Sequence, residues 1–181
     1  MVEPVFRSVL DCLRGSPPAD ILHVALHGQV GGQGREGLVL LAPKVNGGFA
    51  PQFLKYQHVD AVDMPRRTFV FLNACQVGQG RTVLGDYAGL ATAFLAAGAA
   101  GVVAALWNVD DAVASEFAAE FYAAVDNPAR LSVGEALRRA RAAYAADSTD
   151  AGKRSSATLV AYQLFGHPRL RLAPTSRGHD G

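Results

Sequence analysis

The chain has few cysteines, almost no net charge and no long apolar run. Its 181 residues include two cysteines, which are too few for a disulfide framework and favour a reducing, cytoplasmic setting. The formal net charge of +1 argues against an extended basic surface that would bind nucleic acid. No apolar run reaches the roughly 20 residues of a membrane-spanning helix, and the N-terminus lacks the basic and apolar regions of a signal peptide. We therefore expect a cytoplasmic protein without nucleic-acid or membrane partners.

Hydrophobic residues nevertheless make up 50% of the chain, so one domain with a substantial core is expected. Strands are predicted over 21–26, 68–74, 101–107 and 158–165, with a small hairpin within 38–48. Helices are predicted over 4–13, 51–56, 89–97, 110–125 and a segment that Ser132 N-caps. The arginines of that last helix, at 138, 139 and 141, are interpreted as a solvated face. Alternating strands and helices predict an α/β fold with a largely parallel central sheet.

Two of the predicted strands end in residues that can do chemistry. His27 follows the strand over 21–26, and Cys75 follows the strand over 68–74. Because the carboxyl ends of neighbouring parallel strands meet at one edge of a sheet, we expect these residues to lie side by side. A thiol beside an imidazole is the minimal equipment for nucleophilic cysteine catalysis. Their separation is also close to the roughly 50 residues between His and Cys in caspases.

Neighbouring residues add to this hypothesis. Gly28 is expected to let the backbone turn sharply after His27 and to offer its N–H to a substrate carbonyl oxygen, with the Cys75 N–H as a second donor. His23 shares a strand face with His27, so it either supports the catalytic pair or, as we favour, is a core histidine with satisfied hydrogen bonds. Taken alone, Cys75 is typical of a buried structural cysteine, and His27 is typical of a histidine whose hydrogen bonds are satisfied within the fold. Cys12 is also interpreted as a buried cysteine. Together, at matched strand ends, they favour catalysis.

No cofactor or metal is expected from the motifs. The chain has no Cys/His pair at the spacing of zinc ligands. The glycine-rich residues 31–34 match neither a P-loop nor the dinucleotide-binding fingerprint.

Three stretches, in order along the chain, point to a known family. They are residues 21–28, residues 71–78, and a longer stretch over 89–99 and 102–111. With weaker matches at 121–122, 134–140 and 165–168, they resemble the CHAT-domain peptidases, the caspase-like and separase-like branch of the clan CD cysteine peptidases. The resemblance covers about residues 20–172. The expected domain over 20–172 follows an N-terminal helix and linker over 1–19. It precedes a tail over 173–181 that we expect to be flexible.

The resemblance implies a caspase-like three-layer α/β sandwich that hydrolyses peptide bonds through an acyl-enzyme. His27 would be the general base and Cys75 the nucleophile, with the Gly28 backbone in the oxyanion hole. A polypeptide would be the substrate, and an activating or completing protein domain or subunit would be a partner.

Two departures from the family pattern matter. Family members carry additional sheet elements before the His strand, whereas about 20 residues precede it here, so a fragment, a minimal version or a half completed by another polypeptide is expected. Asn73 and Val77 stand where the caspase signature has Gln and Gly, so aspartate specificity is not transferred.

Substrate choice is expected to depend on the loop after the third strand. In separase-like relatives this loop supplies an acidic residue for a basic P1 side chain, and Asp110 and Asp111 occupy the corresponding stretch. The alternative is that they only stabilise a helix N-terminus. Trp107 either lines the pocket or packs in the core, and Asp86, expected in a loop, either contacts substrate or is solvated.

Three functions stay open at this point. The first is a cysteine endopeptidase, favoured because both His27 and Cys75 are present. The second is a catalytically silent or partner-completed caspase-like module for binding or assembly, favoured by the missing upstream elements. The third is a non-peptidase cysteine hydrolase or acyltransferase, which would need a small-molecule pocket.

Overall fold

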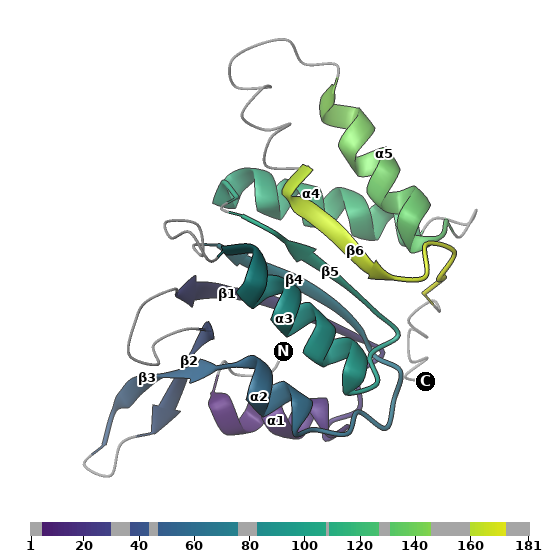
Figure 1. Ribbon diagram of the computed structural model, residues 1–181. Coiled ribbons are helices and arrows are strands. Elements are labelled where there is room, and N and C mark those ends of the chain that lie inside the picture. Colours follow the sequence, from purple (N-terminus) through teal and green to yellow (C-terminus); the bar gives the residue numbers. More distant parts are fainter. Residues whose placement is uncertain are drawn as a thin grey trace, which may run out of the picture.

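The computed structural model describes residues 5–29, 37–43, 47–75, 83–107, 109–126, 131–145 and 160–172, with the backbone alone at 27–29, 41–43, 74–75, 83–88 and 143–145. In chain order the elements are α1 (Phe6–Leu13), β1 (Ile21–Gln29), β2 (Gly37–Pro43), β3 (Phe49–Leu54), α2 (Tyr56–Asp60), β4 (Phe69–Cys75), α3 (Val83–Ala96), β5 (Gly101–Ala105), α4 (Asp111–Val125), α5 (Val133–Ala145) and β6 (Tyr162–Gly166) (Figure 1). The predicted α/β class is confirmed.

The strands form one mixed sheet in the order β3-β2-β1-β4-β5-β6. The central strands β1, β4 and β5 are parallel to one another. The outer pairings, of β1 with β2, of β2 with β3 and of β5 with β6, are antiparallel. Four strands therefore run in one direction, while β2 and β6 run in the other.

Helices cover both faces of the sheet, as β4 shows most clearly. Val70 and Leu72 pack into a core with residues of α1, α2 and α3. Phe69 and Phe71 point the other way, into a core with residues of α4 and α5. All four side chains are buried, which explains why this strand reads as an unbroken apolar run. Figure 1 shows α4 and α5 near β5 and β6, and α1 and α2 near β2 and β3.

The hairpin within 38–48 is confirmed as β2 and β3, but the helix predicted over 51–56 is wrong. Residues 49–54 form the edge strand β3, which pairs with β2 from Leu38↔Leu54 to Pro43↔Phe49. An edge strand tolerates Pro51 because one side of its backbone needs no donor. The helix begins later, at Tyr56.

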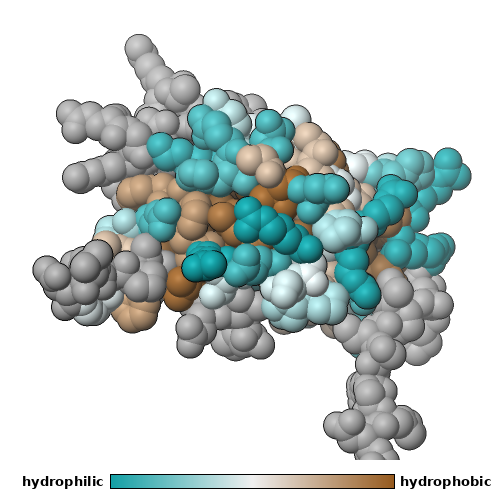
Figure 2. Space-filling model, turned by 90° about the horizontal axis from the view of Figure 1, so that it is seen from below, coloured by the Kyte–Doolittle hydropathy of each residue, from teal (hydrophilic) through white to brown (hydrophobic). Residues whose placement is uncertain are grey.

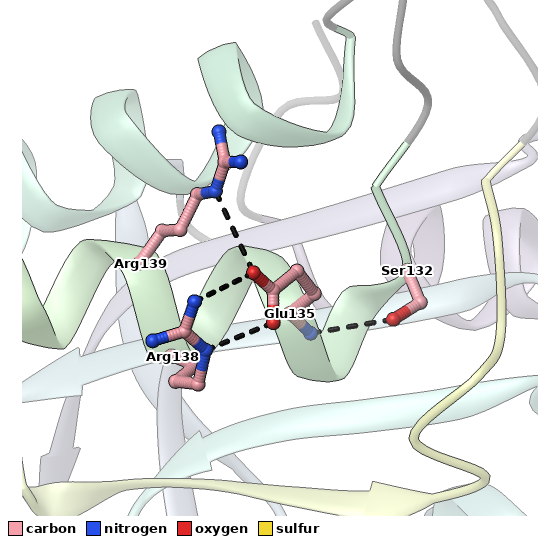
Figure 3. Close-up of polar contacts among 4 residues, drawn as sticks. All are labelled: Ser132, Glu135, Arg138 and Arg139. Carbon is pink, nitrogen blue, oxygen red and sulfur yellow. Dashed lines mark hydrogen bonds and ion pairs between the residues drawn. The ribbon is translucent and has the colours of Figure 1, made fainter.

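Polar contacts define the start of α5, where Arg138 and Arg139 are exposed as expected (Figure 3). The Glu135 N–H donates to Ser132 Oγ at 3.3 Å, so the predicted N-cap is confirmed. The Glu135 carboxylate binds Arg138 at 2.7 and 2.9 Å and lies 3.6 Å from Arg139 Nε, and the Arg138 hydrogen bond lowers the Glu135 pKa. Arg141, however, is half-buried and donates to the Tyr162 carbonyl.

The two faces of β1 are covered unequally. Val24 is buried beside α1–α3, whereas His23 and Ala25, on the opposite face, are exposed. His23 is therefore not the core residue that the sequence suggested. Its ring still stacks on Phe71, with centroids 5.2 Å apart, and its Nδ1 lies 3.0 Å from the Tyr122 hydroxyl. This packing removes water from one side of the ring and lowers the pKa of His23.

We predict that His23 makes the fold less stable in mild acid. Its lowered pKa means that the unfolded chain binds more protons than the folded chain just below the ordinary histidine value of about 6.5. The free energy of unfolding should therefore fall as the pH drops below that value, and His23→Gln should flatten this dependence. Urea unfolding between about pH 7.5 and 5 measures it. An unchanged slope in the variant would contradict the assignment.

Candidate active site

The carboxyl ends of β1 and β4 bring the two predicted catalytic residues to neighbouring positions. The strands pair in parallel from Ile21↔Phe69 to His27↔Cys75, so His27 and Cys75 are partners in the last pair of the ladder. Neighbouring strands lie about 4.8 Å apart. The predicted adjacency of these strand ends is thus confirmed at the level of the backbone.

Gly28 does not make the sharp turn expected after His27. β1 continues through Gln29, and Gly28 and Gln29 pair with Leu38 and Gly37 of β2. This continuation could not be predicted from local pattern, because the pairing depends on β2, a strand that begins only at Gly37. Gly37 itself has φ of +132°, and a Cβ there would lie 2.4 Å from the Leu54 carbonyl oxygen. The His27 side of the site therefore borders a paired strand rather than a free loop.

Trp107 comes after β5, at the position that corresponds by residue count to Cys75 at the end of β4. β4 pairs with β5 up to Leu72↔Ala104, and counting three residues onward on each strand reaches Cys75 and Trp107. β5 ends at Ala105, so Trp107 lies just beyond the strand. It is one of the large hydrophobic residues at the surface, with 40% of its area exposed. Of the two roles considered for it, core packing is therefore the weaker.

Asp110 and Asp111 differ in what they already do. Asp110 is the N-cap of α4, and its Oδ1 accepts hydrogen bonds from the N–H groups of Ala112 and Val113 at 3.1 and 3.2 Å. Asp111 is the first residue of the helix and is exposed. Both lie shortly after the carboxyl end of β5, where the positive end of the α4 helix dipole stabilises their negative charges.

Asp86 lies in a helix, not in the loop that the sequence predicted. α3 begins at Val83, whereas the sequence placed its start near Gly89. Glycine at 85 and 89 masked the helical pattern, because glycine is a poor helix former in isolation. Asp86 therefore belongs to the first turns of the helix that follows Cys75, while residues 76–82 and Asn108 are outside the described part of the chain.

Sequence reasoning missed one polar contact close to Cys75. Asn73, two residues earlier on β4, accepts a hydrogen bond from the Tyr162 hydroxyl, with an O–O distance of 2.5 Å. Its Nδ2 donates to the Ala114 carbonyl at 3.5 Å. Tyr162 is fully buried, and a buried tyrosine hydroxyl needs a partner. The apolar run around residue 162 indicated a strand, but nothing in it named a partner 89 positions away.

Among the described residues, no three His, Cys, Asp or Glu side chains come together as metal ligands. No helix within the same residues is long and apolar enough to cross a membrane.

The CHAT domain family model matches residues 4–171, which includes α1 as well as the two strand ends and all later elements. None of the curated proteins compared with the chain matches it. The CHAT domain family is caspase-like and related to proteases. Since the match covers nearly the whole chain, this protein belongs to the CHAT domain family.

Proposed function

We propose that the chain is a cysteine endopeptidase with a caspase-like fold, in which His27 is the general base and Cys75 the nucleophile. The observation that carries the proposal is the pairing of these two positions at the carboxyl ends of parallel strands. Family membership supports the same chemistry, because the CHAT domain family is related to proteases.

The proposed reaction proceeds through a thioester. His27 takes the proton of the Cys75 thiol, and the thiolate attacks the carbonyl carbon of the scissile peptide bond. The N–H groups of Gly28 and Cys75 donate to the oxygen that becomes negative. His27 then gives its proton to the leaving amine as the C–N bond breaks. A water molecule, deprotonated by His27, hydrolyses the thioester and returns the free thiol.

The proposed specificity is for Arg or Lys at P1. Asp111 is the better candidate for the carboxylate that binds this side chain, because Oδ1 of Asp110 is already engaged by two backbone donors. A carboxylate can pair with an arginine through two parallel hydrogen bonds. Trp107, exposed just after β5, would contact the substrate, and Asp86 is a further candidate contact from α3.

A second function is a silent or partner-completed module for binding or assembly. The observation that favours it is the uncovered part of the sheet, where His23 and Ala25 are exposed and Phe49 of β3 has 55% of its area exposed. Figure 2 shows brown, apolar side chains at the surface interspersed with hydrophilic ones. Gating of the peptidase by such a partner or effector is part of the same proposal.

We predict that an electrophilic probe labels Cys75 much faster than Cys12. Burial raises the pKa of the Cys12 thiol and keeps it in the unreactive protonated form. Cys75 beside His27 should react at least about tenfold faster with iodoacetamide at neutral pH. Labelled peptides counted by mass spectrometry over time measure both rates.

The histidine variants make this test specific. His27→Ala should slow the labelling of Cys75 by about tenfold. His167→Ala, which removes an exposed imidazole after β6, is the matched control and should leave the rate unchanged. Equal, slow labelling of both cysteines would count against an assembled dyad and would favour the silent module.

We also predict that Asp111→Asn weakens cleavage after Arg and Lys more than Asp110→Asn does. Both changes remove one negative charge, and asparagine keeps the N-cap hydrogen bonds at position 110. Loss of a charge-assisted pair should lower kcat/KM for a P1 Arg peptide by about 10- to 100-fold in Asp111→Asn. Rates on peptides that differ only at P1 measure this. A parent preference for Asp or an apolar residue at P1 would refute the specificity.

A further inference from the structure

The pairing of β4 becomes one-sided just before Cys75. On the β1 side the ladder continues from Ala25↔Asn73 to His27↔Cys75. On the β5 side the register ends at Leu72↔Ala104, and β5 itself ends at Ala105. The end of β4 that carries Cys75 therefore depends on other contacts to fix its position on the β5 side.

The side chain of Asn73 supplies such contacts at the first unpaired position. It joins three elements, because its Oδ1 accepts from Tyr162 of β6 at 2.5 Å and its Nδ2 donates to Ala114 of α4 at 3.5 Å. Asparagine is depleted in strands, where its amide adds polar groups that must be satisfied. Here the oxygen and the nitrogen of the amide each make a hydrogen bond, so the Asn73 side chain connects the end of β4 to β6 and to the first turn of α4.

Tyr162 is a fixed partner rather than an adaptable one. Its ring is fully buried and stacks on Phe117, with centroids 4.5 Å apart and planes 18° from parallel. The ring centroid of Phe71, two residues before Asn73, lies 5.7 Å from that of Tyr162. From α5, Arg141 donates to the Tyr162 carbonyl. A hydrogen bond in these apolar surroundings is stronger than one in water and leaves Asn73 little freedom.

We propose that Asn73 and Tyr162 are positioning residues that hold the end of β4, and so the Cys75 nucleophile, at a fixed distance from the N-terminal turn of α4. The proposal rests on the function proposed above, because α4 begins with the aspartates assigned to P1. It adds to that function a contact from β6, a strand that contributes none of the catalytic or substrate-binding residues. Displacements of about 1 Å in an active site can cost about a hundredfold in rate.

The test compares Tyr162→Phe with Thr68→Val. Each variant removes one hydroxyl hydrogen bond from a buried site while keeping the shape of the side chain. Thr68, which immediately precedes β4, donates to the Ala19 carbonyl at 2.6 Å. Asn73→Ala and the double variant Asn73→Ala/Tyr162→Phe complete the set. Urea unfolding, kcat and KM for a P1 Arg peptide, and the rate of Cys75 alkylation are measured for all of them.

We expect Tyr162→Phe to lower kcat about tenfold with KM within about twofold, while Thr68→Val loses stability but keeps kcat. The double variant should lose no more than Asn73→Ala alone, since Asn73→Ala already removes the hydrogen bond that Tyr162→Phe breaks. If Tyr162→Phe and Thr68→Val have the same kcat, or if the losses in kcat multiply, the positioning role is refuted although the peptidase stands. If the parent protein neither cleaves peptides nor labels Cys75 preferentially, the proposed function fails and takes the positioning role with it.

Discussion

Parallel pairing of β1 with β4 is the constraint on which the rest of the molecule depends. The ladder runs over seven register pairs, from Ile21↔Phe69 to His27↔Cys75. A slip of one residue would turn every side chain of one strand to the opposite face. Such a slip would expose Leu72 or bury His23 in the wrong core, so hydrophobic burial fixes the register along the strands. The same register then decides which residues meet at the carboxyl edge, far from the core that enforces it.

The structure around this pair is asymmetric. On the β5 side, β4 is flanked by a fully buried strand, and aromatic rings from α4 pack over Phe71. On the β1 side, one face carries the exposed His23 and Ala25. The end of β4 is therefore held along β1 by the backbone ladder and on the other side by side-chain contacts with α4 and β6, through Asn73 and Tyr162.

The central elements could be predicted from the sequence because local pattern and burial agree there. The expected strand over 68–74 is β4 within a residue at each end, and the expected helix over 110–125 is α4. Predictions failed where distant partners decide the outcome. β3 is a strand at residues 51–54 because β2 pairs with it, and β1 extends through Gly28 for the same reason. Arg141 leaves the solvated face because the Tyr162 carbonyl is within its reach.

The candidate site follows the same division. The meeting of His27 and Cys75 could be inferred from two strand ends, whereas the cap made by Asp110 and the hydrogen bond between Asn73 and Tyr162 needed the folded chain.

The most direct measurement is mass spectrometry of the protein quenched in acid during turnover of a P1 Arg peptide. The account predicts a transient adduct of the acyl half of the peptide on Cys75, absent in Cys75→Ala. Peptide cleavage without that adduct, or neither cleavage nor adduct, would contradict it.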